Sequence, residues 1–262
     1  MHINLSIIEI IKKVIFSNEH IKNYYLKSSP NSKYTLDDIL EGILYVLKTG
    51  IAWRDSKSCV KWNSLYFHFQ RFVKYDIFKH TFLNLRSTLS QKTQFGVKLV
   101  DSSFILNKFG KNCIGRNKYF KNKNCTKLSF MTDENGIPLS ILVKSGNVHD
   151  ITFVEEHIND LVLFDKNSKT KKTTLLADKA YESKNLRSTL KLKNYSTMIP
   201  KKINAKTTYP FDDVLYKKRI KVEHAFQRIK TFRRIANRYD SLITSYLAFV
   251  YLASSILIIK NI

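Results

Sequence analysis

The first ninety residues place apolar side chains at the spacing of an α-helix. Residues 3–16 carry them on one face, and residues 34–47 form a second predicted helix with Thr35 as its N-cap and Gly50 at its end. The aromatic segment 62–78 is predicted as a third helix. Three short helices with a basic third one are typical of a helix-turn-helix module, and a plain helical bundle is an equally good interpretation.

After Gln91 the pattern changes to short apolar runs that predict strands. Glu134-Asn135-Gly136 supplies a hairpin turn between two of these runs. The predicted strands are residues 98–106, 128–132, 138–144, 173–177 and 196–199, and the predicted helices are 150–163, with Asp150 as N-cap, and one from Ser183. Strands followed by alternating strands and helices predict an α/β domain with a mixed sheet. We therefore expect a small all-helical domain over residues 1–92 and the α/β domain over residues 93–262.

The chain ends with two further predicted helices, residues 213–239 and the apolar segment 242–259. The apolar segment is long enough to reach across a bilayer. Thr244, Ser245 and Ser254 interrupt it, and it follows a very basic stretch. We interpret it as a buried core helix, so we expect no membrane partner. Charged residues within the apolar N-terminus argue against a secretory signal, and we expect a cytoplasmic or nucleoid-associated protein.

The chain is strongly basic, with 45 Lys and Arg against 21 Asp and Glu, a formal net charge of +24. Such a surplus favours polyanions, of which nucleic acids and anionic membrane surfaces are the commonest. A coding sequence rich in A and T would also enrich the chain in Lys. Charge alone therefore favours nucleic-acid binding and leaves a membrane-surface protein as an alternative.

Two aspartates stand in apolar strands. Asp101 lies within a run that contains Leu99, Val100 and Phe104, and Asp178 ends the run 173–177. A carboxylate inside such a strand is costly unless something pairs with it. If the two strands are neighbours, the carboxylates converge, and a divalent cation is the usual partner for such a pair. Each aspartate alone is also explained as a strand-end residue that caps a turn.

The late basic helix carries a single acid, Glu223, among nine basic residues between 217 and 238. At about 100° per residue, Tyr216, Arg219 and Lys230 lie within roughly 40° of Glu223, and Gln227 lies one turn on. This stripe suits a helix whose carboxylate completes a metal site while its cations hold phosphates. The alternative is that Glu223 makes ordinary helical ion pairs.

Three carboxylates without a His or Cys cluster indicate a hard metal, magnesium or manganese. Two such ions about 3.5–4 Å apart would activate an attacking oxygen and stabilise the leaving oxygen of an in-line displacement at phosphorus. Water as the attacker would give hydrolysis, and a DNA 3′-hydroxyl would give strand transfer.

The spacing of Tyr216, Arg219, Glu223 and Lys230 matches, without a gap, the signature Tyr-x2-Arg-x3-Glu-x6-Lys. The chain thereby resembles the DDE transposases of bacterial-type insertion sequences, in the group named for insertion sequence five. Residues 42–55, 127–150 and 178–183 extend the resemblance over nearly the whole chain. It implies an RNase H-like catalytic core, with Asp101 on the first strand, Asp178 just after the fourth and Glu223 on a late helix.

The same resemblance implies that Arg219 and Lys230 contact DNA and that Tyr216 contacts a terminal base or packs beside it. The full set of DNA contacts that we expect is Tyr216, Arg219, Gln227, Lys230, Arg233 and Arg234 in the late helix, and Lys61, Arg71 and Lys74 in the N-terminal helices. The chain departs from the family where Ala180 replaces a glycine and where residues 118–125 replace a glycine-rich segment.

We therefore expect a transposase that nicks double-stranded DNA at terminal inverted repeats and joins the 3′-ends to target DNA. Asp101, Asp178 and Glu223 would be its catalytic and metal-binding residues, with two magnesium or manganese ions per site and no small-molecule substrate. Two ends require two active sites, so at least a homodimer is expected on DNA. The alternatives are an RNase H-like nuclease without strand transfer and a non-catalytic DNA-binding protein derived from a transposase.

Overall fold

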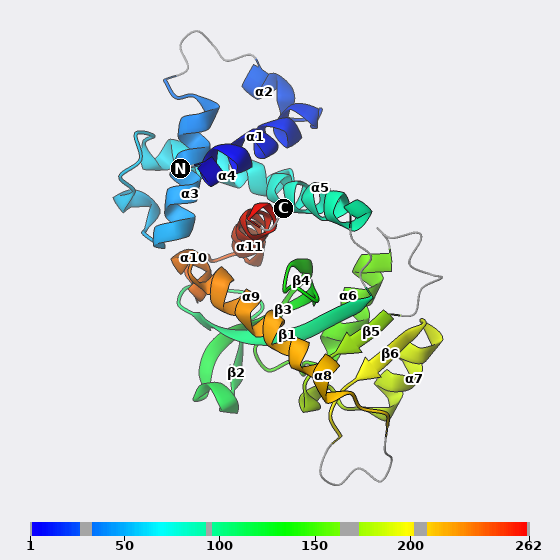
Figure 1. Cartoon of the computed structure of the whole chain (residues 1–262). Helices are drawn as coiled ribbons and strands as arrows, with labels where there is room; N and C mark the ends of the chain where they lie inside the picture. Colours follow the sequence, from blue (N-terminus) through cyan, green and yellow to red (C-terminus); the bar gives the residue numbers. More distant parts are fainter. Residues whose placement is uncertain (1, 27–32, 93–95, 163–172, 202–208, 261–262) are drawn as a thin grey trace. The chain divides into compact units, whose positions relative to one another are not determined.

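The computed structural model describes residues 2–26, 33–92, 96–162, 173–201 and 209–260 (Figure 1). The chain forms two compact units. The first comprises Met1–Arg86, Asn107–Asn112 and Arg228–Ile262, and the second comprises Ser87–Leu106 and Cys113–Gln227.

The second unit is built on a mixed sheet, as the sequence predicts. Its strands are β1 (Val97–Asn107), β2 (Gly115–Asn117), β3 (Lys123–Asp133), β4 (Pro138–Ser145), β5 (Thr173–Leu176) and β6 (Tyr195–Met198). Their order is β2-β3-β1-β5-β6, and β4 also pairs with β3. β3 runs antiparallel to β1 and β4, whereas β5 runs parallel to β1 and β6. The predicted hairpin lies between β3 and β4, where Gly136 has a φ of 79°. The short strand β2 was not predicted.

Helices cover both faces of this sheet. On one face, α6 (Thr152–Val162) and α7 (Lys184–Leu192) pack their apolar side chains onto a core that includes Val100 of β1 and Met131 of β3. On the other face, the ring of Phe226 in α9 (Ile220–Lys230) stacks on Phe130 of β3. Because successive side chains of a strand point to opposite faces, Asp101 faces α9 while its neighbour Val100 faces α6.

The first unit is helical. It contains α1 (His2–Ser17), α2 (Lys22–Leu26), α3 (Leu36–Thr49), the turn η1 (Trp53–Asp55), α4 (Trp62–Lys74) and α11 (Ile243–Ile259), and most of α5 (Ile77–Lys92). Thr35 caps α3 in a reciprocal arrangement with Asp38, and Gly50 ends that helix with a φ of 68°, both as predicted.

The apolar segment at the end of the chain forms α11, most of whose residues are buried. Phe249 of α11 stacks on Phe69 of α4 with ring centroids 4.5 Å apart. Within the part of the chain that the structure describes, no helix has the length and apolar character needed to cross a bilayer. The burial of most residues of α11 confirms its interpretation as a core helix.

Two predicted helices are interrupted. The helix expected over residues 62–78 ends at Lys74, because Asp76 adopts a left-handed conformation with a φ of 52° and α5 starts afresh at Ile77. The predicted helix over residues 213–239 is divided into α8 (Asp213–Tyr216), the 3₁₀ turn η5 (Lys217–Arg219), α9 and the short α10 (Arg233–Ala236). Its last part is not helical, because Asn237–Arg238 form the short strand β7.

The break after α9 has a local cause. The N–H groups of Thr231 and Phe232 donate to the carbonyl groups three residues earlier, which tightens the last turn, and Phe232 is then extended. The helix expected to reach residue 163 runs as α6 to Val162; residue 163 lies outside the described residues.

Candidate active site

Asp101 lies in the middle of β1, directly opposite Phe130 of β3. Its side chain is 21% exposed. Its Oδ1 accepts a hydrogen bond of 2.8 Å from the backbone N–H of Ser102. Burial raises the pKa of the Asp101 carboxyl to about 6; this hydrogen bond and the charge of Arg219 oppose the rise, and the carboxylates of Asp178 and Glu223 add to it.

Asp178 follows the parallel strand β5. Leu99 of β1 pairs with Leu176 of β5, so Asp101 and Asp178 each lie two residues beyond a paired position on adjacent parallel strands. Oδ1 of Asp178 accepts a hydrogen bond of 2.8 Å from the backbone N–H of Ala180, which opens the 3₁₀ turn η4 (Lys179–Tyr181). The carboxylate therefore also caps a turn, the alternative that the sequence left open for it.

Glu223 and Arg219 come from the segment that crosses the Asp101 face of the sheet. Arg219 Nη1 lies 3.3 Å from Asp101 Oδ2, and its Nη2 contacts Glu223 Oε1. One guanidinium thus joins two of the three predicted carboxylates. The ordinary helical ion pair that the sequence offered as an alternative for Glu223 is present, and Asp101 extends it into a three-residue cluster.

In this structure the three predicted carboxylates do not converge on one metal-binding position. Among the described residues, no group of three or more His, Cys, Asp and Glu side chains lies close enough together to hold a metal ion. The positive charge between Asp101 and Glu223 is supplied by Arg219. The set nevertheless suits a hard divalent cation, because its donors are all carboxylates and because the pKa of Asp101 is raised in part by the other two acids.

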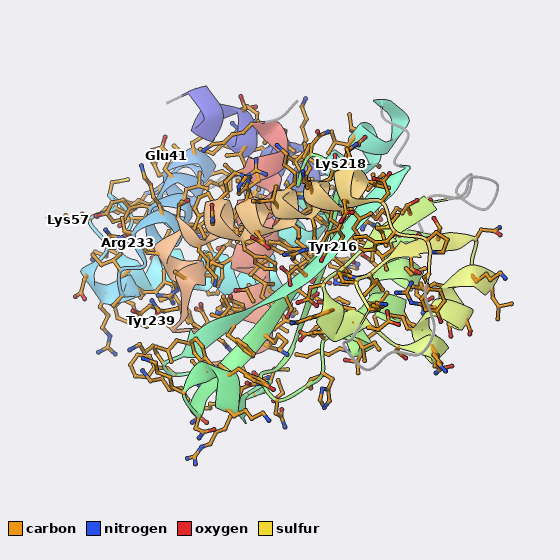
Figure 2. The ribbon with its side chains drawn as sticks, turned by 60° about the horizontal axis from the view of Figure 1, so that its bottom comes forward. Glu41, Lys57, Tyr216, Lys218, Arg233 and Tyr239 are labelled. Atoms are coloured by element: carbon orange, nitrogen blue, oxygen red, sulfur yellow. The ribbon has the colours of Figure 1, made fainter. Side chains whose placement is uncertain are left out.

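The remaining predicted residues of the late helix differ in exposure. Tyr216 is half-buried and packs on Phe211, with ring centroids 5.0 Å apart. Gln227 is exposed, whereas Lys230 is half-buried and burial lowers its pKa. Figure 2 labels Tyr216 on the segment that leads into α9, together with Lys218, which was not singled out from the sequence. Lys218 is exposed and forms an ion pair with Glu134 of the β3–β4 turn.

The predicted DNA-contacting residues of the first unit also differ in exposure. Arg234 is buried, and its guanidinium pairs with Asp240 at 2.7 Å, so its charge is neutralised within the protein and is not exposed to DNA. Arg71 is half-buried over the ring of Tyr24, 3.7 Å from the ring centroid. The exposed members are Lys61, Lys74 and Arg233.

A polar chain behind Asp101 was not found from the sequence. Ser129 Oγ donates to the backbone carbonyl of Asp101 and lies 2.9 Å from His157 Nε2, and His157 Nδ1 lies 2.9 Å from Ser140 Oγ. Burial lowers the pKa of His157 to about 3, so the ring is neutral. The signal in the sequence is a histidine at a core position of an amphipathic helix, which periodicity alone does not connect to Asp101.

The fold and the family agree with the sequence-based expectation. The mixed sheet with helices on both faces is RNase H-like, and a solved structure of similar fold is a piggyBac transposase synaptic complex with hairpin DNA, at a TM-score of 0.58 and 10% identity over 97% of this chain and 74% of that chain. Residues 92–258 match the family described as the transposase DDE domain, and the chain belongs to that family.

A relative in sequence is a protein of Brucella ovis named as a transposase for insertion sequence element IS6501. It is 29% identical over 134 residues, which is 50% of this chain and 96% of the relative. The expectation of a DDE transposase of an insertion sequence is thereby confirmed, and the chain is a DNA transposase. Its place in the group named for insertion sequence five stays a prediction.

Proposed function

We propose that this transposase cleaves and joins DNA strands at Asp101, Asp178 and Glu223, which would hold two magnesium or manganese ions. One observation carries the assignment: Asp101 and Asp178 each lie two residues beyond the paired residues Leu99 and Leu176 of adjacent parallel strands, while Arg219 links Asp101 to Glu223. Bound divalent ions would supply activation of the attacking oxygen and stabilisation of the leaving oxygen in an in-line displacement.

Arg219 has two roles in this proposal. Without metal it neutralises Asp101 and Glu223, whose charges would otherwise repel. With metal bound to the carboxylates, the guanidinium would be free to contact a DNA phosphate beside the reacting bond, where its planar fork can bind two oxygens. The Arg219 side chain is long and partly exposed, so it could turn from the carboxylates towards the phosphate.

We assign the recognition of double-stranded DNA to the remaining basic residues. Residues 1–92 would bind the terminal inverted repeats, and residues 93–262 would carry the catalysis. The proposed contacts are Lys61, Arg71 and Lys74 from the first unit's helices, and Tyr216, Arg219, Gln227, Lys230 and Arg233 from the late segment. Cleavage of two ends requires two sites, so the active form would be a homodimer or higher oligomer on DNA.

The test uses a plasmid that carries this gene with its natural flanking DNA on both sides. The full chain is incubated with it and Mg²⁺ or Mn²⁺, and nicks and joined 3′-ends are mapped. We expect nicks at the element's ends, and loss of nicking by at least a hundredfold in Asp101→Asn and Glu223→Gln, because each removes one charged ligand.

Glu156→Gln is the matched control, since it removes one exposed carboxylate of α6. It should nick as the parent does. Undiminished nicking by Asp101→Asn or Glu223→Gln rejects the assignment. Cut ends without joined products would favour the nuclease, and tight DNA binding without any cut would favour the non-catalytic binding protein.

A further inference from the structure

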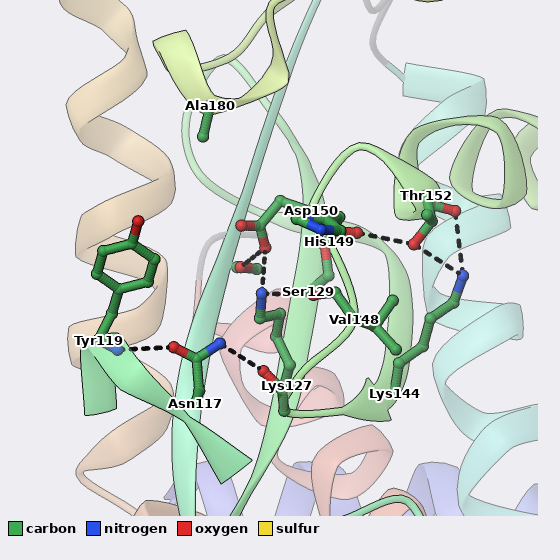
Figure 3. Close-up of polar contacts among 12 residues, drawn as sticks. Asn117, Tyr119, Lys127, Ser129, Lys144, Val148, His149, Asp150, Thr152 and Ala180 are labelled. Carbon is green, nitrogen blue, oxygen red and sulfur yellow. Dashed lines mark hydrogen bonds and ion pairs between the residues drawn. The ribbon is translucent and has the colours of Figure 1, made fainter. Parts of the chain in front are cut away.

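A second acidic residue lies behind Asp101, on the α6 face of the sheet. Asp150, just before α6, meets Ser102 of β1 and Lys127 of β3 in a set that we call the Lys127 cluster (Figure 3). Ser102 donates its hydroxyl hydrogen to Asp150 Oδ1. From the sequence we expected Asp150 to cap α6, but these contacts direct its carboxylate to the sheet.

Lys127 pairs with Asp150 from a buried position. Its side chain is 4% exposed, and its Nζ lies 3.1 Å from Asp150 Oδ1 and 2.8 Å from the carbonyl oxygen of Val148. The ammonium group also lies 4.9 Å from the ring centroid of Phe104. A buried ammonium is costly unless it is paired, so the Asp150 carboxylate has a strong reason to stay in place.

The Lys127 cluster is connected to Asp101 through the backbone of Ser102. Asp150 holds the side chain of Ser102, and the N–H of that same residue donates to Asp101 Oδ1. The orientation of this N–H depends on the backbone of β1 at Ser102. Fixing the Ser102 side chain on one face of the sheet therefore fixes the hydrogen-bond donor that orients the Asp101 carboxylate on the other face.

Tyr181 connects the same region to Asp178. Its side chain is 1% exposed. Burial, and then the charges of Asp150, Asp101 and Asp178, raise the pKa of this phenol. Asp150 thus lies within electrostatic range of the same group as the two strand aspartates, which makes it part of the surroundings of the active site.

We propose that Asp150, held by Lys127, is a positioning residue that orients the Asp101 carboxylate for metal through Ser102. The proposal rests on the proposed function, in which Asp101 is a metal ligand. Asp150 itself touches neither substrate nor metal in this account. Its loss would leave Asp101 present and poorly oriented.

The experiment measures two quantities on the full chain. Binding of Mn²⁺ alone, without DNA, is followed by the loss of the free-ion electron paramagnetic resonance signal. The Mn²⁺ dependence of nicking is measured on the plasmid described above. The decisive variant is Ser102→Ala, because it removes the hydroxyl but keeps both the Lys127–Asp150 pair and the backbone N–H to Asp101.

We expect Ser102→Ala and Asp150→Asn to weaken Mn²⁺ binding about tenfold or more, and to raise the Mn²⁺ concentration for half-maximal nicking by a similar factor. Ser102→Thr keeps the hydroxyl and should restore both values. Glu156→Gln removes a carboxylate from the exposed ion pair with Lys144, and should change neither. Equal thermal stability of Ser102→Ala and the parent excludes a general loss of structure.

The outcomes separate the two proposals. Normal Mn²⁺ binding and nicking by Ser102→Ala, with an active parent, overturns the role of Asp150 and leaves the active-site assignment intact. If the parent binds Mn²⁺ but does not cut DNA, the proposed function is wrong. The Mn²⁺ binding of the variants then still tests the role of Asp150. A parent that neither binds Mn²⁺ nor nicks overturns both.

Discussion

The ring of Phe226 in α9 stacks on the ring of Phe130 in β3, with centroids 4.8 Å apart and planes inclined by 6°. Phe130 is paired directly with Asp101, and Phe226 follows Glu223 by one helical turn. The stack therefore fixes where α9 crosses the sheet and places Glu223 on the Asp101 face. An aromatic contact in the core thus determines which acid on the helix meets the acid on the strand.

Shortening Phe226 should separate folding from catalysis. Phe226→Leu keeps an apolar side chain but loses the flat contact with Phe130, so we expect a modest loss of stability and a larger fall in nicking rate. Phe226→Ala should cost about 3–5 kcal/mol of unfolding free energy. Urea unfolding and single-turnover nicking are the measurements. Phe249→Leu, a buried aromatic of α11, is the control, and equal nicking losses in both leucine variants would contradict the positioning role.

Removing Arg219 should have opposite effects on metal binding and on nicking. In Arg219→Gln the carboxylates of Asp101 and Glu223 lose their counter-charge, so we expect tighter Mn²⁺ binding by isothermal titration calorimetry. Nicking should fall, because the proposed phosphate contact is lost. Lys218→Gln, which breaks an exposed ion pair on the same segment, should leave metal binding unchanged. Weaker Mn²⁺ binding by Arg219→Gln would argue against this role.

His157 should make the second unit less stable in mild acid. Burial lowers its pKa from 6.5 to about 3, so the unfolded chain takes up a proton before the folded one does. This contribution is complete above about pH 6.5 and is lost as the pH falls towards 3, at up to about 1.4 kcal/mol per pH unit. Urea unfolding at pH 7.5 and 5.5 should show a smaller difference in the free energy of unfolding between the two pH values for His157→Gln than for the parent. If the variant and the parent lose the same unfolding free energy between these pH values, His157 is not the cause of the acid sensitivity.

Local rules were enough for the elements that determine the fold. Thr35 and Gly50 bound α3 because caps act within a few residues, and the acids in strands stood out because Asp101 and Asp178 interrupt apolar runs. The parallel pairing of β1 with β5, which gives the two aspartates matching positions, is a long-range contact that only the family resemblance implied.

The sequence did not reveal contacts between residues far apart in the chain. Lys127 lay just before the predicted strand 128–132, as one of several basic residues in that region. Its burial against Asp150 depends on how β3 and the start of α6 meet. The same holds for Arg219, whose second partner Asp101 is 118 residues away. The helix break after Lys230 depends on the backbone bonds of Thr231 and Phe232, whose side chains carry no strong breaking signal.

Arg233 and Arg234 are neighbours with the same side chain, and we expect their substitutions to have different effects. The guanidinium of Arg234 is buried, pairs with Asp240 and donates to the carbonyl oxygen of Ile51. Removing one partner of a buried pair leaves an uncompensated charge, so Arg234→Met should cost about 3–5 kcal/mol of unfolding free energy. Arg233 is exposed, and Arg233→Gln should leave stability within about 0.5 kcal/mol of the parent.

DNA binding should show the reverse pattern. If Arg233 contacts one phosphate, Arg233→Gln reduces the slope of log affinity against log salt by about 0.9, whereas the folded fraction of Arg234→Met keeps the slope of the parent. The measurement is fluorescence anisotropy with labelled flanking duplex over a range of KCl concentrations, alongside urea unfolding. Arg234→Lys separates charge from geometry, because lysine restores the charge without the paired hydrogen bonds and should recover only part of the stability. If fully folded Arg234→Met shows a smaller slope of log affinity against log salt than the parent, Arg234 contacts DNA after all.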